Sequence, residues 1–106
     1  HIKNPAAGLY GLFNATLGAF TISEAIAVVL GGTSATFNIL QNATYQTSGA
    51  TKVWTADKTV SASATPTSYT SFDDATVPAD FCVLVQVVSI SGTPTDLIVQ
   101  WQGTYD

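Results

Sequence analysis

The sequence predicts an all-β fold, an antiparallel β-sandwich that is jelly-roll-like and has about seven to eight strands. Three observations support this prediction. β-Branched and aromatic residues gather in short runs in which apolar and polar positions alternate. Gly, Pro, Asn and Asp separate these runs at intervals of roughly 8–12 residues, which is typical of sandwiches and small barrels. A chain of 106 residues is long enough for one hydrophobic core and too short for two.

The first 18 residues form an apolar segment that turn-forming residues interrupt repeatedly, namely Pro5, Gly8, Gly11 and Gly18. A linker of this composition would expose apolar surface to water. We therefore expect residues 1–18 to be an arm or edge segment that docks against protein, for example a neighbouring subunit. Residues 19–106 are then the β-sandwich domain.

Two strands are predicted on either side of Gly31-Gly32. Residues 19–30 alternate so that one face carries five apolar residues and Glu24, the odd member. The alternative is a short helix capped by Ser23, but the clustering of Thr, Ile and Val favours a strand. Residues 33–41 alternate again, and the intervening glycines indicate a hairpin.

The middle of the chain is expected to contain shorter elements. A short strand at residues 43–47 is optional, further strands lie at 51–61 and 67–72, and loops lie at 62–66 and 73–80. The strand at 51–61 places Val53 and Val60 inward, with an interruption near Asp57.

The last quarter of the chain carries the strongest signal. Residues 81–90 and 96–105 are two long β-prone runs around a loop that contains Gly92 and Pro94, which predicts a closing β-hairpin. The first run is apolar on both faces, as in a central strand covered twice. The opposite sheet supplies one cover, and the second is expected from the N-terminal arm or from another subunit. We therefore predict a homo-oligomer.

Composition excludes several classes of function. Charged residues make up 9% of the chain, the net charge is −4, and there is no Arg. Nucleic-acid binding needs a basic face, so it is not expected. No stretch reaches the roughly 18 apolar residues of a membrane span, so we expect no membrane insertion. A weakly charged surface is expected where other protein covers much of it. It is equally typical of the Ser/Thr-rich exterior of many extracellular or viral β-domains.

Residue types that carry catalysis are scarce. His1 is the only His, and Cys82 stands alone in an aliphatic run, where it is expected to be a small buried hydrophobe. The loop at 73–80 holds Asp73, Asp74 and Asp80, which are candidate Ca²⁺ ligands, but a solvated turn with Asp capping local amides is the simpler interpretation. We expect neither enzyme activity nor a cofactor.

Seven aromatic residues remain as candidates for an interface or for contact with a glycan: Tyr10, Phe13, Tyr45, Trp54, Tyr69, Trp101 and Tyr105. Exposed aromatic rings stack on sugars, whereas aromatic residues in strands more often anchor a core or an interface. Trp101 alternates with Leu97 and Val99, so we expect it to be packed. Trp54 fits either interpretation.

From Trp54 onward the chain resembles the small β-domains of tailed-bacteriophage virion proteins. The elements are the strand WTADKTVSAS, the loop SFDDATVPA, the aliphatic strand CVLVQVVSISG and a terminal strand that ends in TYD. The resemblance covers about half of the chain. It implies a non-enzymatic, commonly trimeric component of the virion, assembled in the host cytoplasm with other virion proteins, that decorates the capsid or forms part of a tail fibre. The alternative is a carbohydrate-binding or adhesin module that recognises host-surface glycans.

Overall fold

The computed structural model describes residues 1–15 and 18–106, and the side chains of all of these except residues 12–14. It contains ten strands and, in the described residues, no helix. The strands are β1 (Ile2–Lys3), β2 (Gly8–Asn14), β3 (Phe20–Leu30), β4 (Ser34–Asn42), β5 (Thr51–Lys52), β6 (Lys58–Ser61), β7 (Thr67–Tyr69), β8 (Thr76–Val77), β9 (Cys82–Ser91) and β10 (Asp96–Tyr105).

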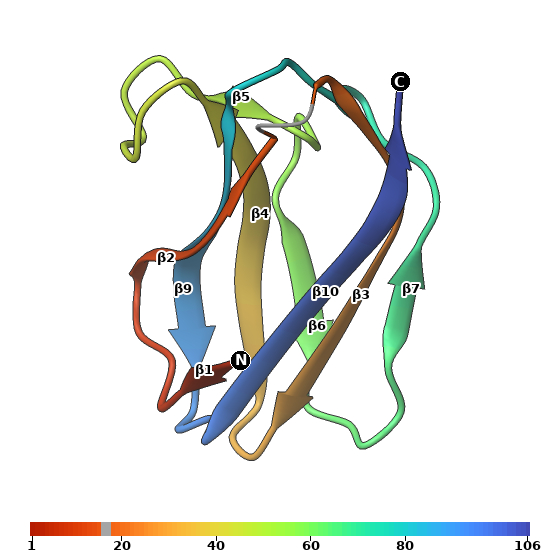
Figure 1. The fold of residues 1–106 in the computed structure, drawn as a ribbon. Helices are drawn as coiled ribbons and strands as arrows, with labels where there is room; N and C mark the ends of the chain where they lie inside the picture. Colours follow the sequence, from red (N-terminus) through yellow and green to blue (C-terminus); the bar gives the residue numbers. More distant parts are fainter. Residues whose placement is uncertain (16–17) are drawn as a thin grey trace.

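The strands form two five-stranded antiparallel sheets that pack face to face (Figure 1). One sheet has the order β1-β10-β3-β7, with β8 also on β3, and the other has the order β2-β9-β4-β5, with β6 also on β4. The pairing is nested, because β1 pairs with β10, β2 with β9, β3 with β7 and β8, and β4 with β5 and β6. Nested antiparallel pairs folded over into two sheets define a jelly roll. The predicted fold class is confirmed. The strand count rises to ten because the N-terminal segment contributes β1 and β2, the strand predicted at 51–61 is divided into β5 and β6, and β8 lies in the stretch 73–80 that was predicted to be a loop.

Both predicted hairpins are wrong, although their strands are present. β3 and β4 flank Gly31-Gly32 but belong to different sheets, and β9 and β10 flank residues 92–95 in the same way. Two apolar runs on either side of a short glycine-containing turn can pair as a hairpin, but they can equally be strands of two different sheets joined by that turn. Packed sheets lie about 10 Å apart, a distance that three or four residues of about 3.3 Å each can span.

The two crossing turns pack against each other at one end of the sandwich. The Thr33 amide donates to the Ser91 carbonyl (3.0 Å), and the Thr95 amide donates to the Leu30 carbonyl (2.8 Å). Gly32 has a φ of 63°, and a Cβ added to it would lie 2.5 Å from the backbone nitrogen of Pro94. A glycine is therefore required at this contact.

A β-bulge changes the inward face of β3 halfway along the strand. Gln102 lies opposite Glu24 and Gly103 opposite Ile22, so Ser23 is the extra residue. The buried residues of β3 are Phe20 and Ile22 before the bulge, and Ala25, Ala27 and Val29 after it. The predicted core face is therefore wrong beyond the bulge, because Glu24 and the three apolar residues that follow it at alternate positions face outward.

The outer face of β9 receives its second cover from the chain itself. Leu40, Cys82 and Leu84 form a buried cluster outside the main core, with Leu9 and Ala50 packed against it. Leu9 belongs to the N-terminal segment, one of the two predicted sources of this cover. Cys82 is buried, as expected.

Residues 43–50 form a loop beside this cluster, so the optional strand at 43–47 is absent. The Asn42 side-chain amide donates to the carbonyls of Gln46 (2.8 Å) and Ser48 (3.0 Å). The Tyr45 hydroxyl donates to the Leu9 carbonyl (3.1 Å). These bonds tie the loop to β4 and to β2.

The remaining elements follow the prediction closely. The strand at 51–61 is interrupted between β5 and β6, and Val53 and Val60 are both buried. β1 and β2, both in the predicted arm, are edge strands of the two sheets. Within the described part of the chain, no helix is long and apolar enough to cross a membrane.

Candidate functional site

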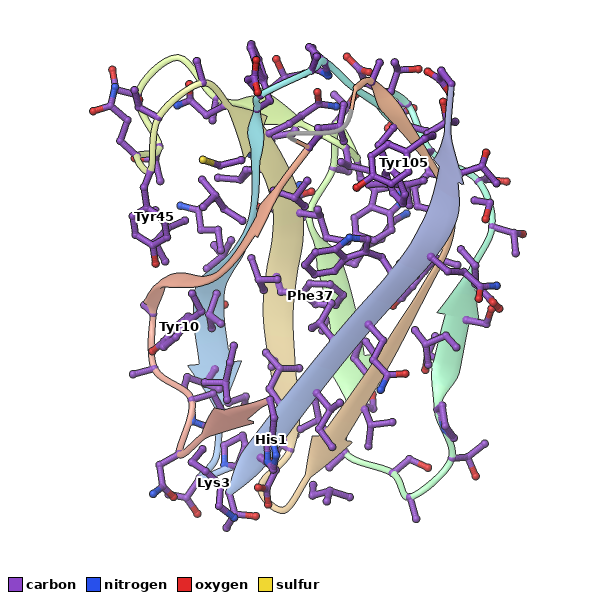
Figure 2. The ribbon with its side chains drawn as sticks, viewed as in Figure 1. His1, Lys3, Tyr10, Phe37, Tyr45 and Tyr105 are labelled. Atoms are coloured by element: carbon purple, nitrogen blue, oxygen red, sulfur yellow. The ribbon has the colours of Figure 1, made fainter. Side chains whose placement is uncertain are left out.

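The aromatic candidates lie in separate regions of the molecule (Figure 2). On one side of the sandwich, Trp54 is only 2% exposed. Its ring stacks on Phe72 (centroids 5.5 Å apart), lies beside Tyr69 (5.2 Å) and meets the edge of Phe37 (5.9 Å). We call Phe37, Trp54, Tyr69 and Phe72 the Trp54 cluster. Lys58 places its ammonium 5.6 Å from the Trp54 centroid and 5.8 Å from that of Tyr69, within cation–π range.

A buried amide holds the Trp54 cluster in place. The Asn38 side chain donates to the Trp54 carbonyl (2.8 Å) and to the Asp57 carboxylate (2.8 Å), and it accepts from the Trp54 amide (3.4 Å). The Trp54 indole donates to the Ser71 carbonyl (2.9 Å). All of these groups are therefore satisfied within the fold, and Trp54 is a core anchor with no face open to a sugar.

The same contacts account for two shifted titrations. The hydrogen bond from Asn38, followed by that from Lys52, holds the pKa of Asp57 below its usual value. Burial raises the pKa of Tyr69. Asp57 is thus ionised at neutral pH and bonded to Asn38 and Lys52.

Tyr10 and Trp101 lie on the opposite side of the sandwich. They line a crevice of about 210 Å³ with His1, Ile2, Gly11, Val85 and Val99. We call it the open-side crevice, because it lies between the β1/β10 side of one sheet and the β2/β9 side of the other. The Tyr10 hydroxyl donates to the Ala6 carbonyl (2.8 Å), so its polar end is already used.

A charged cluster adjoins this crevice at the start of β10, where Figure 2 shows His1 and Lys3 together. The Asp96 carboxylate lies 2.7 Å from the His1 ring nitrogen Nε2 and 2.8 Å from the Lys3 ammonium. The Thr95 hydroxyl donates to its other oxygen (2.9 Å). The hydrogen bond from Lys3, followed by that from Thr95, lowers the pKa of Asp96. This carboxylate is committed to the fold.

A shallow hollow lies on the outer face of the β1-β10-β3-β7 sheet and is lined mainly by polar side chains. Its lining residues are Glu24, Ile26, Gln100, Trp101 and Gln102. Glu24 accepts from the Ser68 hydroxyl (2.6 Å) and from the Gln102 amide (2.9 Å). The hollow measures about 70 Å³, well below the roughly 300–1,000 Å³ of a ligand pocket.

The other aromatic candidates do not join these groups. Tyr45 (51% exposed) lies on the loop after β4, and Tyr105 (44% exposed) lies near the C-terminal end of β10, far across the molecule in Figure 2. The Tyr105 ring meets Phe20 edge-on, with centroids 5.3 Å apart. The side chain of Phe13 lies outside the described residues. Tyr10 and Trp101 are thus the two candidates that share a solvent-facing crevice.

The acidic loop at 73–80 contacts the backbone of the segment between β5 and β6. The Asp73 carboxylate accepts from the Thr55 amide (2.7 Å), and the amides of Asp73 and Asp74 both donate to the Val53 carbonyl. Asp73 therefore caps a backbone amide, as the simpler interpretation expected, but this amide is 18 residues away in the chain rather than local. In the described ranges, no group of three or more His, Cys, Asp and Glu residues is arranged to hold a metal ion.

Sequence reasoning missed Asn38, which it placed among the polar alternates of its strand. The structure buries it completely. The available signal was weak, namely an amide between Phe37 and Ile39 in a strand whose outer face also carries Leu40.

Comparison of the chain with protein-family models, with curated proteins and with solved structures finds no match.

Proposed function

We propose that this protein is a non-enzymatic structural component of a bacteriophage virion, which decorates or stabilises the capsid or forms part of a tail fibre. It acts by packing its β-domain against further copies of itself and against other virion proteins. The observation that carries the proposal is a jelly-roll scaffold with very little charge, since only 9% of its residues are charged. Such a surface presents little electrostatic repulsion to a protein neighbour.

The hydrogen bonds of the carboxylates support a structural role for this protein rather than a catalytic one. Asp57, Asp73, Asp96 and Glu24 each accept hydrogen bonds from the chain's own amides, hydroxyls or ammonium groups. Acid–base catalysis needs a group that can exchange protons with a substrate in a cleft. A protein that binds only the assembled particle stabilises that particle by mass action, and this requires a docking surface rather than an active site.

The test is association with particles. Virions purified from a culture that produces this protein are analysed by mass spectrometry and by labelling with a specific antibody in the electron microscope. We expect the protein on the head or the tail, and we expect particles stripped of it to open at a lower temperature until purified protein is added back. The resemblance noted in the sequence implies a trimer of this chain. Absence from the particles, together with no effect of added protein, would contradict the proposal.

The second candidate is a carbohydrate-binding module, which the solvent-facing crevice shared by Tyr10 and Trp101 favours. Aromatic rings that remain accessible to solvent can stack on a sugar ring. A glycan array with the wild-type protein and Trp101→Ala tests it, with Thr67→Ala on the far edge of the same sheet as the matched control. Loss of a glycan signal in Trp101→Ala alone is expected, whereas no signal for the wild type rejects this candidate.

A further inference from the structure

A break in the pairing along β4 gathers three side chains that can react with one another. On this edge β4 pairs with β6 at residues 34–37 and with β5 at residues 40–41, so Asn38 lies where one partner strand ends and the other begins. Figure 1 shows both partner strands beside β4. Lys52 is the last residue of β5, and Asp57 immediately precedes β6. The fold thus brings an amide, an amine and a carboxylate to one place.

A single carboxylate oxygen contacts both nitrogen atoms of this group. The Asn38 nitrogen Nδ2 donates to Asp57 Oδ1 over 2.8 Å, and the Lys52 ammonium donates to the same oxygen over 3.3 Å. Asn38 is completely buried, whereas the Lys52 side chain is 47% exposed. Because a Lys side chain has a flexible four-carbon stem, rotation can carry its nitrogen from the carboxylate to the neighbouring Asn38 carbon Cγ.

The carbonyl oxygen of the same Asn38 amide is held by two backbone donors. Oδ1 accepts from the Ile39 amide (2.8 Å) and from the Trp54 amide (3.4 Å). Two backbone N–H groups directed at one carbonyl oxygen stabilise the negative charge that this oxygen gains when a nucleophile adds to the carbon. Asn38 is therefore placed as an electrophile, Lys52 as a nucleophile, and Asp57 as a proton carrier between the attacking and the leaving nitrogen.

We propose that Lys52 and Asn38 join in an intramolecular isopeptide bond. The Lys52 ammonium gives one proton to solvent, and its neutral amine attacks Asn38 Cγ, so that an Nζ–Cγ bond forms and Oδ1 becomes negative. Asp57 takes a second proton from Nζ and passes it to Nδ2. The Cγ–Nδ2 bond then breaks, Oδ1 returns to a carbonyl oxygen, and ammonia leaves. The third Nζ proton stays on the new amide.

The reaction needs no reagent from outside the chain. One amide replaces another without oxidation or reduction, and the ammonia is lost into water, so the reverse step is negligible. The fold supplies the proximity that a reaction between a separate amine and amide lacks. The step happens once in each chain and turns over no substrate. It goes beyond the proposed function and does not depend on it.

Mass spectrometry of the full chain tests the bond. We expect the denatured wild-type protein to be lighter than its sequence by one ammonia. The chain contains three Lys and no Arg, and trypsin does not cleave after a Lys whose side chain is acylated. A digest should therefore contain the peptide 4–58, lighter by one ammonia, in place of peptides 4–52 and 53–58. Fragmentation of this peptide should locate the link between Asn38 and Lys52.

Variants at two lysines separate the bond from another source of ammonia loss, the cyclisation of Asn onto its own backbone. Lys52→Arg keeps the positive charge but removes the amine, so we expect the full mass and cleavage after residue 52. Lys58→Arg is the matched control, because the Lys58 ammonium lies over the Trp54 and Tyr69 rings. This variant should lose ammonia as the wild type does.

Asp57→Ala tests the proton carrier. General acid–base catalysis contributes at least about a hundredfold to such a step. After a fixed incubation of freshly refolded protein, we therefore expect Asp57→Ala to remain largely at full mass while the wild type has reacted. Circular dichroism of each variant checks that it is folded. Equal extents of reaction in Asp57→Ala and the wild type contradict the role assigned to this carboxylate.

A folded wild-type chain that keeps its full mass and is cleaved after Lys52, even after prolonged incubation, overturns the proposal. Ammonia loss that persists in Lys52→Arg also overturns it, because cyclisation of an Asn then accounts for the mass. Neither result bears on the virion proposal, which the particle test decides. A bonded chain that is absent from virions, in turn, upholds the isopeptide bond and contradicts the proposed function.

Discussion

The two sides of the sandwich each contain a tryptophan in or beside a strand, but Trp54 is buried in the core and Trp101 lines a crevice that faces solvent. Trp54 is buried among three aromatic rings, and its backbone is bonded to a buried Asn. Trp101 has a comparable strand context but lines an open crevice. The difference teaches that the coverage of the sheet edges, more than the aromatic residues themselves, determines which side becomes core and which becomes surface.

The Trp54 side is closed by the chain that links β5 to β6. The Val53 amide donates to the Ile39 carbonyl (2.9 Å), and the amides of Asp73 and Asp74 donate to the Val53 carbonyl. This segment therefore bridges β4 and the loop that follows β7. On the Trp101 side, the edge strands are the two-residue β1 and the irregular β2. A crevice of about 210 Å³ lies between the sheets there.

Trp54→Ala should have the largest effect on stability. Removing a buried Trp leaves a cavity, and we expect the free energy of unfolding to fall by about 3–5 kcal/mol. Trp101→Ala, at the half-buried position, should lose about 1–2 kcal/mol. Equilibrium unfolding in urea measures both, and equal losses would show that the two sides are packed alike.

Asn38→Ala tests the polar support of the same cluster. It leaves the Trp54 carbonyl and the Asp57 carboxylate without their buried donor, which should lower the free energy of unfolding by about 2–3 kcal/mol. Gln100→Ala, an exposed amide on the open side, is the matched control and should change it by less than about 0.5 kcal/mol. A loss at Asn38 no larger than the control would mean that water replaces its bonds.

Gly32→Ala tests whether the crossing turns are as tightly packed as the Trp54 side. Both the positive φ and the approach of Pro94 oppose a Cβ, so a loss of about 2 kcal/mol is expected in thermal or urea unfolding. Gly11→Ala, on the open side, has a positive φ but nothing within 4 Å of the added Cβ. Its loss should be about 1 kcal/mol, from the backbone term alone. Equal losses would indicate that Pro94 moves aside.

The pH dependence should show the smallest effect. Because the folded-state pKa of Asp57 is lowered, the unfolded chain binds its proton more readily, so this group stabilises the fold above its unfolded pKa of about 3.9. That contribution is lost as the pH falls through the folded-state pKa. Asp57→Asn should therefore flatten the acid limb of a plot of unfolding free energy against pH.

Asp96→Asn is the open-side counterpart, since its pKa is lowered in the same direction. We expect a weaker flattening than at Asp57, because Lys3 is largely exposed and its contact is screened by solvent. An acid limb that neither substitution changes would mean that other carboxylates cause it.

Of the candidate site, only part could be predicted. The alternation of apolar and polar residues correctly predicted that the Trp101 side chain packs against the core. It did not decide whether Trp54 is buried or exposed. The same alternation could not predict that Asn38 is buried, because its hydrogen-bond partner Trp54 lies 16 residues later in the chain. The shared crevice of Tyr10 and Trp101 depends on β2 and β10 lying on the same side of two different sheets.

The sequence alone specifies the long strands, their approximate limits and inward residues such as Val53 and Val60. These follow from alternation and turn chemistry, which act between near neighbours on the backbone. Tertiary structure decided which strands pair and where the bulge at Ser23 reverses a face. Those outcomes depend on contacts between residues far apart in the chain, where a glycine turn between two apolar runs permits either a hairpin or a passage to the opposite sheet.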